Sequence, residues 1–103
     1  APLGPCIVTA DEIPDPQNLA IKLELNGKVM QEDTTAHMIF NCAVLIEFLS
    51  AVGTLEPGDI ISTGTPDGVG VFRKPPVFLK AGDVTKITIE KIGALSNPVA
   101  VER

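Results

Sequence analysis

The chain has 103 residues, 45% of them hydrophobic, and a formal net charge of -5, which fits one globular domain or part of one with a modest core. Because the charge is acidic and the basic residues are scattered, we expect neither nucleic acid nor an anionic membrane as a partner. The sequence contains no apolar run near the roughly 18 residues that cross a bilayer. Its two cysteines, Cys6 and Cys42, lie far apart, which favours small buried thiols in a reducing, cytoplasmic compartment over a disulfide or a metal pair.

The first third of the chain predicts one short strand and a hairpin. Residues 6–9 form a short β-branched run that indicates a strand, and residues 11–18 are rich in turn formers. Residues 19–25 alternate in polarity, Asn26-Gly27 follows, and residues 28–31 resume the strand pattern. Asn-Gly is the strongest short-range signal for a type I′ hairpin turn. The chain begins with Ala1 and an immediate Pro-Gly turn, so we expect a portion of a longer protein.

The middle of the chain predicts one helix. A polar connector at 33–37 precedes Asn41, a suitable N-cap, and Gly53 is suited to the position just past the last helical residue. Between them, residues 42–52 carry an apolar stripe that extends around most of the helix. Such a helix is buried on more than one side, which implies packing against segments outside these residues or against a second subunit.

The last third of the chain predicts further strands. Residues 55–60 and 79–84 resemble each other as turns that lead into strands, with Asp59 and Asp83 as turn acceptors. Residues 73–76 indicate a stiff extended linker, and 85–90 alternate as a half-exposed strand. A final strand at 95–101 is interrupted at Asn97-Pro98, which favours an edge position. We therefore predict a β-rich fold with one main helix, a curled mixed sheet or barrel-like roll.

Residues 60–70 are the most informative stretch. Ile60-Ile61 predicts a buried strand, and Ser62 to Gly70 adds two threonines, a proline and three glycines. A loop of this type can direct amide N–H groups and hydroxyls at a small anion, because glycine lets the backbone approach closely. A glycine- and proline-rich surface turn is the alternative interpretation.

Little else in the chain predicts catalysis. His37 is the only histidine, and a nucleophilic triad would need it together with Ser62, Thr63 or Thr65; a surface position near the helix entry is the favoured interpretation. The histidine count excludes a histidine-based metal site, and no two carboxylates are separated by a single residue. The residues therefore predict an anion-facing loop and no complete catalytic apparatus.

Several motifs in fixed order resemble the fumarylacetoacetate hydrolase (FAH) family across essentially the whole chain. They lie at residues 4–13, 15–19, 26–27, 38–40, 55–59, 63–70, 73–76, 78–79, 92–93 and 97–98. The resemblance implies a roll of mixed β-sheets and a homodimer. It identifies residues 1–103 with the C-terminal portion of one catalytic domain, whose N-terminal portion would be absent here. His37 is a departure, since relatives often carry Asp or another polar residue there.

The resemblance also implies a function. Family enzymes use Mg²⁺ or Mn²⁺ on small 2-oxo or 2-hydroxy-dienoate acids, which they hydrolyse at C–C bonds, decarboxylate or isomerise. The family's metal ligands, lysine and lid would all precede Ala1, so this chain is expected to supply neither metal ligands nor catalytic residues and to be inactive alone. Thr65 resembles the threonine that binds the substrate carboxylate, with Gly64 allowing the approach and Thr63 as the second choice. A stand-alone, non-catalytic β-roll that binds a carboxylate or mediates assembly remains the alternative.

Overall fold

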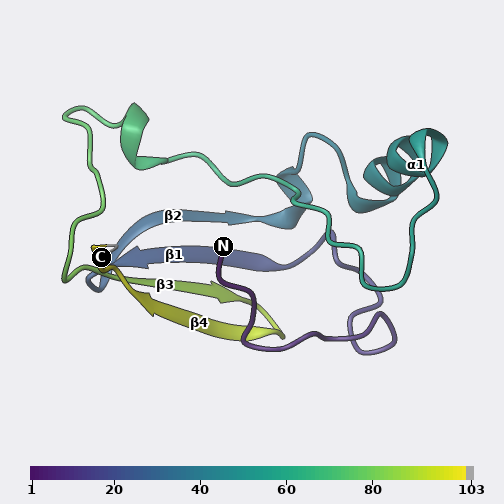
Figure 1. The fold of residues 1–103 in the computed structure, drawn as a ribbon, viewed down its shortest axis with the longest axis horizontal. Coiled ribbons are helices and arrows are strands. Elements are labelled where there is room, and N and C mark those ends of the chain that lie inside the picture. The colour runs from purple at the N-terminus through teal and green to yellow at the C-terminus, as the bar shows by residue number, and fades with distance from the viewer. Residues whose placement is uncertain (102–103) are drawn as a thin grey trace.

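A four-stranded antiparallel sheet dominates the computed structural model, which describes residues 1–101 (Figure 1). The strands are β1 (Ala20–Leu25), β2 (Lys28–Thr34), β3 (Val84–Ile89) and β4 (Gly93–Pro98). Their order across the sheet is β2-β1-β3-β4, so β2 and β4 form the two edges. The predicted hairpin, the strand near 85–90 and the edge position of the last strand are confirmed. Over residues 1–101 every pairing is antiparallel, so the mixed pairing implied by the resemblance is not seen in this chain.

The hairpin turn is held by a network that links it to the start of β3. Asn26 and Gly27 both have positive φ, 51° and 78°, as a type I′ turn requires. The Asn26 amide donates to Asp83 Oδ1 at 2.9 Å, and its carbonyl oxygen accepts from the Val84 N–H at 2.8 Å. Asn26 thus joins the tip of one hairpin to a turn that lies 57 positions further along the chain.

The two predicted turn acceptors have the same local geometry. Asp59 Oδ2 accepts from the Glu56 N–H at 2.8 Å, and Asp83 Oδ2 accepts from the Lys80 N–H at 3.0 Å. Both interpretations as turn acceptors are therefore confirmed. Asp83 is only 4% exposed, and hydrogen bonds from the Asn26 side chain and then from the Lys80 N–H lower the pKa of its carboxyl group.

The helical elements lie in the long connection between β2 and β3. They are η1 (Thr35–His37), α1 (Cys42–Val52) and η2 (Gly70–Phe72). Asn41 caps α1 by accepting from the Val44 N–H at 2.8 Å, as predicted. Gly53 ends the helix with φ of -164°, so its extended backbone makes no use of the left-handed conformation that glycine permits. None of the helices within residues 1–101 has the length and hydropathy needed to cross a bilayer.

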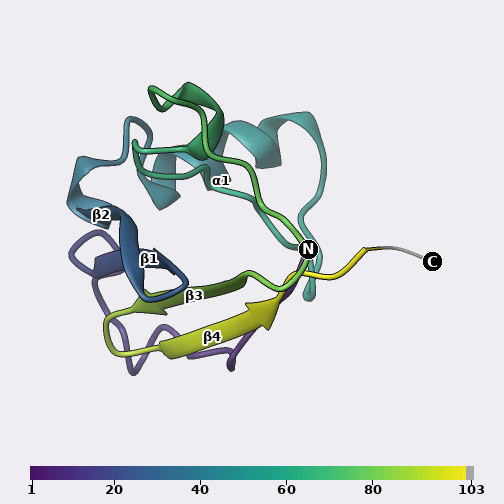
Figure 2. The same ribbon diagram turned by 90° about the vertical axis from the view of Figure 1, so that its left-hand side faces the viewer.

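Few of the apolar side chains are buried. Within residues 1–101 the buried hydrophobic residues are Ile13 and Leu19, whereas Phe48 on α1 is 68% exposed. The chain exposes 8035 Å², compared with about 5,500 Å² for a compact monomer of this mass. Figure 2 shows α1 and the segment around η2 on the side of the molecule opposite β3 and β4. The apolar surface of α1 is therefore uncovered in this chain.

Four local predictions were wrong. Residues 6–9 and Ile60-Ile61 form no strand, because β-branched residues favour a strand only where a neighbouring strand pairs with them. Ile60 is 72% exposed rather than buried. Residues 73–75 form a bend with a cis Lys74–Pro75 bond rather than an extended linker. Both cysteines are free, but Cys6 is exposed, and Cys42 is only half-buried.

The pairing between β1 and β2 contains one irregularity, at Met30. Leu23 pairs with Gln31 and Glu24 pairs with Val29, so Met30 is skipped. A β-bulge of this kind leaves the extra residue unpaired and re-aims the neighbouring side chains. Because β2 is an edge strand, the Met30 carbonyl and the Gln31 side chain are both available to the connection that runs beside it (Figure 1).

The Asp83 network predicts a defined acid sensitivity. Because folding lowers the pKa of Asp83 below its ordinary value of 3.8, ionised Asp83 stabilises the fold above that pH, and the contribution is lost as the pH falls through the lowered pKa. In the protein that contains this chain, Asp83→Asn should therefore lower the melting temperature near pH 6. Between pH 6 and about pH 3, the melting temperature of the variant should fall less than that of the wild type. Glu32→Gln, on an exposed carboxylate, controls for net charge. An unchanged slope in Asp83→Asn would contradict the role of this network.

Candidate functional site

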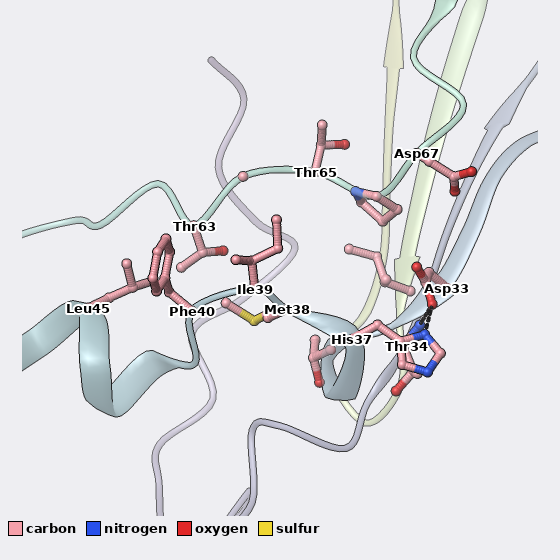
Figure 3. A pocket seen from close by; sticks show the side chains of 14 residues that line it. Asp33, Thr34, His37, Met38, Ile39, Phe40, Leu45, Thr63, Thr65 and Asp67 are labelled. Atoms are coloured by element: carbon pink, nitrogen blue, oxygen red, sulfur yellow. Dashed lines mark hydrogen bonds and ion pairs between the residues drawn. The ribbon is translucent and has the colours of Figure 1, made fainter.

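A cavity of about 430 Å³ lies between the loop at residues 63–67 and the segment at residues 33–40 (Figure 3). The loop is the stretch that the sequence singled out, and the opposite wall comprises the end of β2, η1 and the entry to α1. Ile39 and Phe40 contribute exposed apolar surface to this wall. The cavity therefore combines an apolar wall with a loop of hydroxyls and backbone amides, which is the usual composition of a small-molecule site.

The three predicted substrate-binding residues all line this cavity. Gly64 has φ of +98°, with open space where a Cβ atom would lie. Residues i and i+2 of a regular strand point to the same side, but Figure 3 shows Thr63 directed towards Ile39 and Phe40 and Thr65 directed to the other side of the loop. The left-handed backbone at Gly64 accounts for this reversal.

The backbone of the same loop retains free donors. Within the part of the chain that the structure describes, the amide N–H groups of Thr63, Gly64 and Thr65 donate to no protein acceptor. All three residues are exposed. Such N–H groups can bind an anion without first breaking a hydrogen bond inside the protein.

Two side chains attach the loop to the edge of the sheet. Gln31 Nε2 donates to Thr65 Oγ1 at 2.9 Å and to the Pro66 carbonyl at 2.6 Å. Arg73 donates through Nε to the Gly68 carbonyl at 2.8 Å and through Nη2 to the Met30 carbonyl. The sequence pattern missed both residues as parts of the site, because Gln31 and Arg73 each join β2 to a segment more than 30 positions away.

His37 and Asp33 form a hydrogen-bonded pair at the wall of the cavity. His37 Nδ1 lies 2.6 Å from Asp33 Oδ1, and the imidazole side chain is 72% exposed. Hydrogen bonds from the Thr34 N–H and then from His37 lower the pKa of Asp33. The surface position predicted for His37 is confirmed, but its partner was missed, because Asp33 lies on β2 and His37 in η1, and no helical spacing links them. In the described residues His37 bonds to no hydroxyl of Ser62, Thr63 or Thr65, so no triad forms.

The residues present do not fit a divalent cation. Among residues 1–101, no three histidine, cysteine, aspartate or glutamate side chains are grouped to hold a metal ion. Asp33 and Asp67 both line the cavity, but within the described residues no third histidine, cysteine or carboxylate side chain is grouped with them.

The β-sheet, the single α-helix of residues 1–101 and the threonine–glycine loop beside the sheet edge are the features expected of an FAH-family catalytic domain. The sequence matches the family model described as fumarylacetoacetate (FAA) hydrolase C-terminal over residues 1–100, and the chain therefore belongs to the FAH family. Oxaloacetate tautomerase fahd2, mitochondrial, from Xenopus laevis, is 56% identical over 98 residues, which cover 95% of this chain and 31% of that protein.

Solved structures show the same fold. The FAH from Exiguobacterium antarcticum has a TM-score of 0.94 and 42% identity, and the match covers 98% of this chain and 36% of that one. Maleylpyruvate hydrolase from Sphingobium sp. SYK-6, in complex with manganese(II) ion and pyruvate, has a TM-score of 0.81 and 41% identity over 92% of this chain and 33% of that one. The chain thus spans about a third of the length of the relatives it matches.

The packing of the loop against β2 predicts that alanine costs more stability at Gly68 than at Gly58. Gly68 and Gly58 both have positive φ, +91° and +103°, but only at Gly68 would a Cβ atom meet another group, the Met30 carbonyl at 2.5 Å. Both alanine variants strain the backbone, and Gly68→Ala adds an overpacking cost of about 1–3 kcal/mol. Thermal unfolding of the protein that contains this chain should show the larger loss for Gly68→Ala. Equal losses would contradict the close contact.

Proposed function

We propose that this chain forms the carboxylate-binding part of an FAH-family hydrolase or isomerase that acts on small 2-oxo or 2-hydroxy-dienoate acids. The observation that carries the proposal is the exposed loop at the cavity, where the N–H groups of Thr63, Gly64 and Thr65 have no protein acceptor within residues 1–101. These N–H groups and the Thr65 hydroxyl are the donors that a carboxylate requires.

Oxaloacetate is the first substrate to test, and tautomerisation is the first reaction. Its support is the 56% identity to a relative named oxaloacetate tautomerase. Keto–enol tautomerisation moves one proton between a carbon and the neighbouring carbonyl oxygen, so the substrate loses no atoms. The part of this chain in that reaction is to hold one carboxylate and thereby fix the orientation of the carbonyl group beside it. C–C hydrolysis and decarboxylation are the competing reactions.

The charges at the cavity support a division of roles between this chain and the rest of the protein. Asp33 and Asp67 contribute negative charge to the cavity, which disfavours an anionic acid, whereas the loop contributes neutral donors. A Mg²⁺ or Mn²⁺ ion held by residues outside this chain would supply the missing positive charge. The manganese(II) and pyruvate bound to the Sphingobium relative support this part of the proposal.

Assembly and location remain proposals. The uncovered face of α1, which includes Phe48 and Val52, supports packing against the N-terminal portion of the same protein. The homodimer is proposed from the family resemblance, as is the assignment of residues 1–103 to the C-terminal portion of one catalytic domain. A cytoplasmic location is likewise proposed, whereas the tautomerase relative is named as mitochondrial.

The proposal predicts a specific defect when the Thr65 hydroxyl is removed. A hydrogen bond to a charged group contributes roughly 1.5–3 kcal/mol, so Thr65→Val should raise KM for oxaloacetate about tenfold or more in the protein that contains this chain. The measurement is the rate of enol-to-keto conversion, followed by the ultraviolet absorbance of the enol, with Mg²⁺ or Mn²⁺ restored after chelation. Thr54→Val, which changes a threonine outside this cavity, is the matched control.

Two results would contradict the proposal. One is a wild-type protein that turns over neither oxaloacetate nor an acylpyruvate nor a hydroxy-dienoate at any divalent-cation concentration, which would favour the non-catalytic module. The other is an unchanged KM in Thr65→Val, which would remove this loop from substrate binding and leave the family membership intact.

A further inference from the structure

We propose that Gln31 is a positioning residue that sets the direction of the Thr65 hydroxyl, so that its hydrogen points at the carboxylate of the bound acid. This inference rests on the proposed function, because it concerns how the same loop recognises a carboxylate. Gln31 lies on β2, immediately after the residue that the bulge skips, and contacts the loop from the edge of the sheet.

The geometry determines which end of the Gln31 amide faces the loop. The Pro66 carbonyl oxygen, 2.6 Å from Gln31 Nε2, can only accept hydrogen bonds, so the NH₂ end of the amide must face it. The same nitrogen lies 2.9 Å from Thr65 Oγ1. Towards Thr65, Gln31 is therefore a donor, and the threonine oxygen is the acceptor.

The direction of the hydroxyl hydrogen follows from this assignment. A hydroxyl has one hydrogen and two lone pairs. When Gln31 occupies one lone pair, the hydrogen points away from Gln31 and needs another acceptor. Thr65 is exposed and lines the cavity, on the side of the loop opposite Thr63 (Figure 3), so its hydrogen can meet a ligand that approaches from that side. A carboxylate, which only accepts, satisfies it; an uncharged ester accepts more weakly.

A separate anchor keeps the loop in place when Gln31 is changed. Arg73 holds the Gly68 and Met30 carbonyls, and neither of these contacts involves the Gln31 side chain. Substitution of Gln31 removes the bonds to Thr65 Oγ1 and to the Pro66 carbonyl and leaves the Arg73 anchor in place, so the Thr65→Val background is needed to separate the direction of the hydroxyl from a shift of the loop. This separation makes the proposal testable by ligand preference rather than by activity alone.

The experiment measures how strongly the protein that contains this chain prefers an acid to its neutral ester. Dissociation constants for pyruvate and methyl pyruvate are compared by titration calorimetry at one fixed Mn²⁺ concentration. Gln31→Met keeps the side-chain length and adds no charge, and it should reduce the acid-to-ester preference about three- to tenfold, the range expected for one hydrogen bond. In a Thr65→Val background, the same change should have almost no further effect on this preference, because its target hydroxyl is absent.

A matched control separates orientation from general damage. Gln17 also donates to a backbone carbonyl, that of Thr35 at 3.1 Å, and accepts from the Cys42 N–H at 2.8 Å, but it does not contact the loop. Because the Gln17 bonds hold the opposite wall of the cavity rather than the loop, Gln17→Met should lower stability and weaken the binding of acid and ester alike, and leave the preference at the wild-type value. If Gln31→Met does not fold, Gln31→Asn, whose amide falls one methylene short of the loop, tests the same expectation.

The outcomes separate the two proposals. A wild-type protein with no preference for pyruvate over its ester overturns both the proposed function and the role of Gln31. A wild-type preference that survives in Gln31→Met, or that falls by the same factor in the presence and in the absence of the Thr65 hydroxyl, overturns the role of Gln31 alone. The proposal is supported if Gln31→Met lowers the acid-to-ester preference when Thr65 is present and leaves it unchanged in the Thr65→Val background.

Discussion

The site depends on one irregularity at the edge of the sheet. Because the pairing between β1 and β2 skips Met30, the Met30 carbonyl accepts from Arg73 and the next side chain, Gln31, reaches Thr65 and Pro66. A regular edge strand would present evenly spaced polar groups suited to another strand. The bulge instead presents one carbonyl and one amide to a loop without strand structure, and this places the predicted anion-binding residues beside the sheet.

A second network, at the tip of the hairpin, supports the register of β2. Side chains alternate between the two faces of a strand, so a slip of one residue would move Gln31 to the wrong face. The turn at Asn26 opposes such a slip, because its side chain is bound to both Asp83 and Val84. The position of Thr65 therefore depends, through β2, on a buried aspartate just before β3.

The sequence predicted the elements whose signals are local. Asn26-Gly27 marks a hairpin within four residues, and Asn41 together with the spacing of apolar residues marks α1. The absence of strands at 6–9 and 60–61 could not be predicted, because composition does not show whether a partner strand is present. The candidate loop was located by its threonines and glycines, but Gln31 was missed. Its contact with Thr65 spans 34 positions and depends on a bulge that no local pattern reveals.

The polarity of the cavity explains how a chain with a net charge of -5 could still bind an acid. Neutral N–H and O–H groups stabilise an anion through their direction rather than through net charge, so their contribution depends on how rigidly they are held. Here Arg73 and Gln31 hold the loop by bonds to its carbonyls and to one hydroxyl. Asp33 and Asp67 at the same cavity would penalise a second carboxylate placed near them. Recognition in this chain should therefore be directional, with a single carboxylate bound by the loop and the rest of the acid extending away from the aspartates.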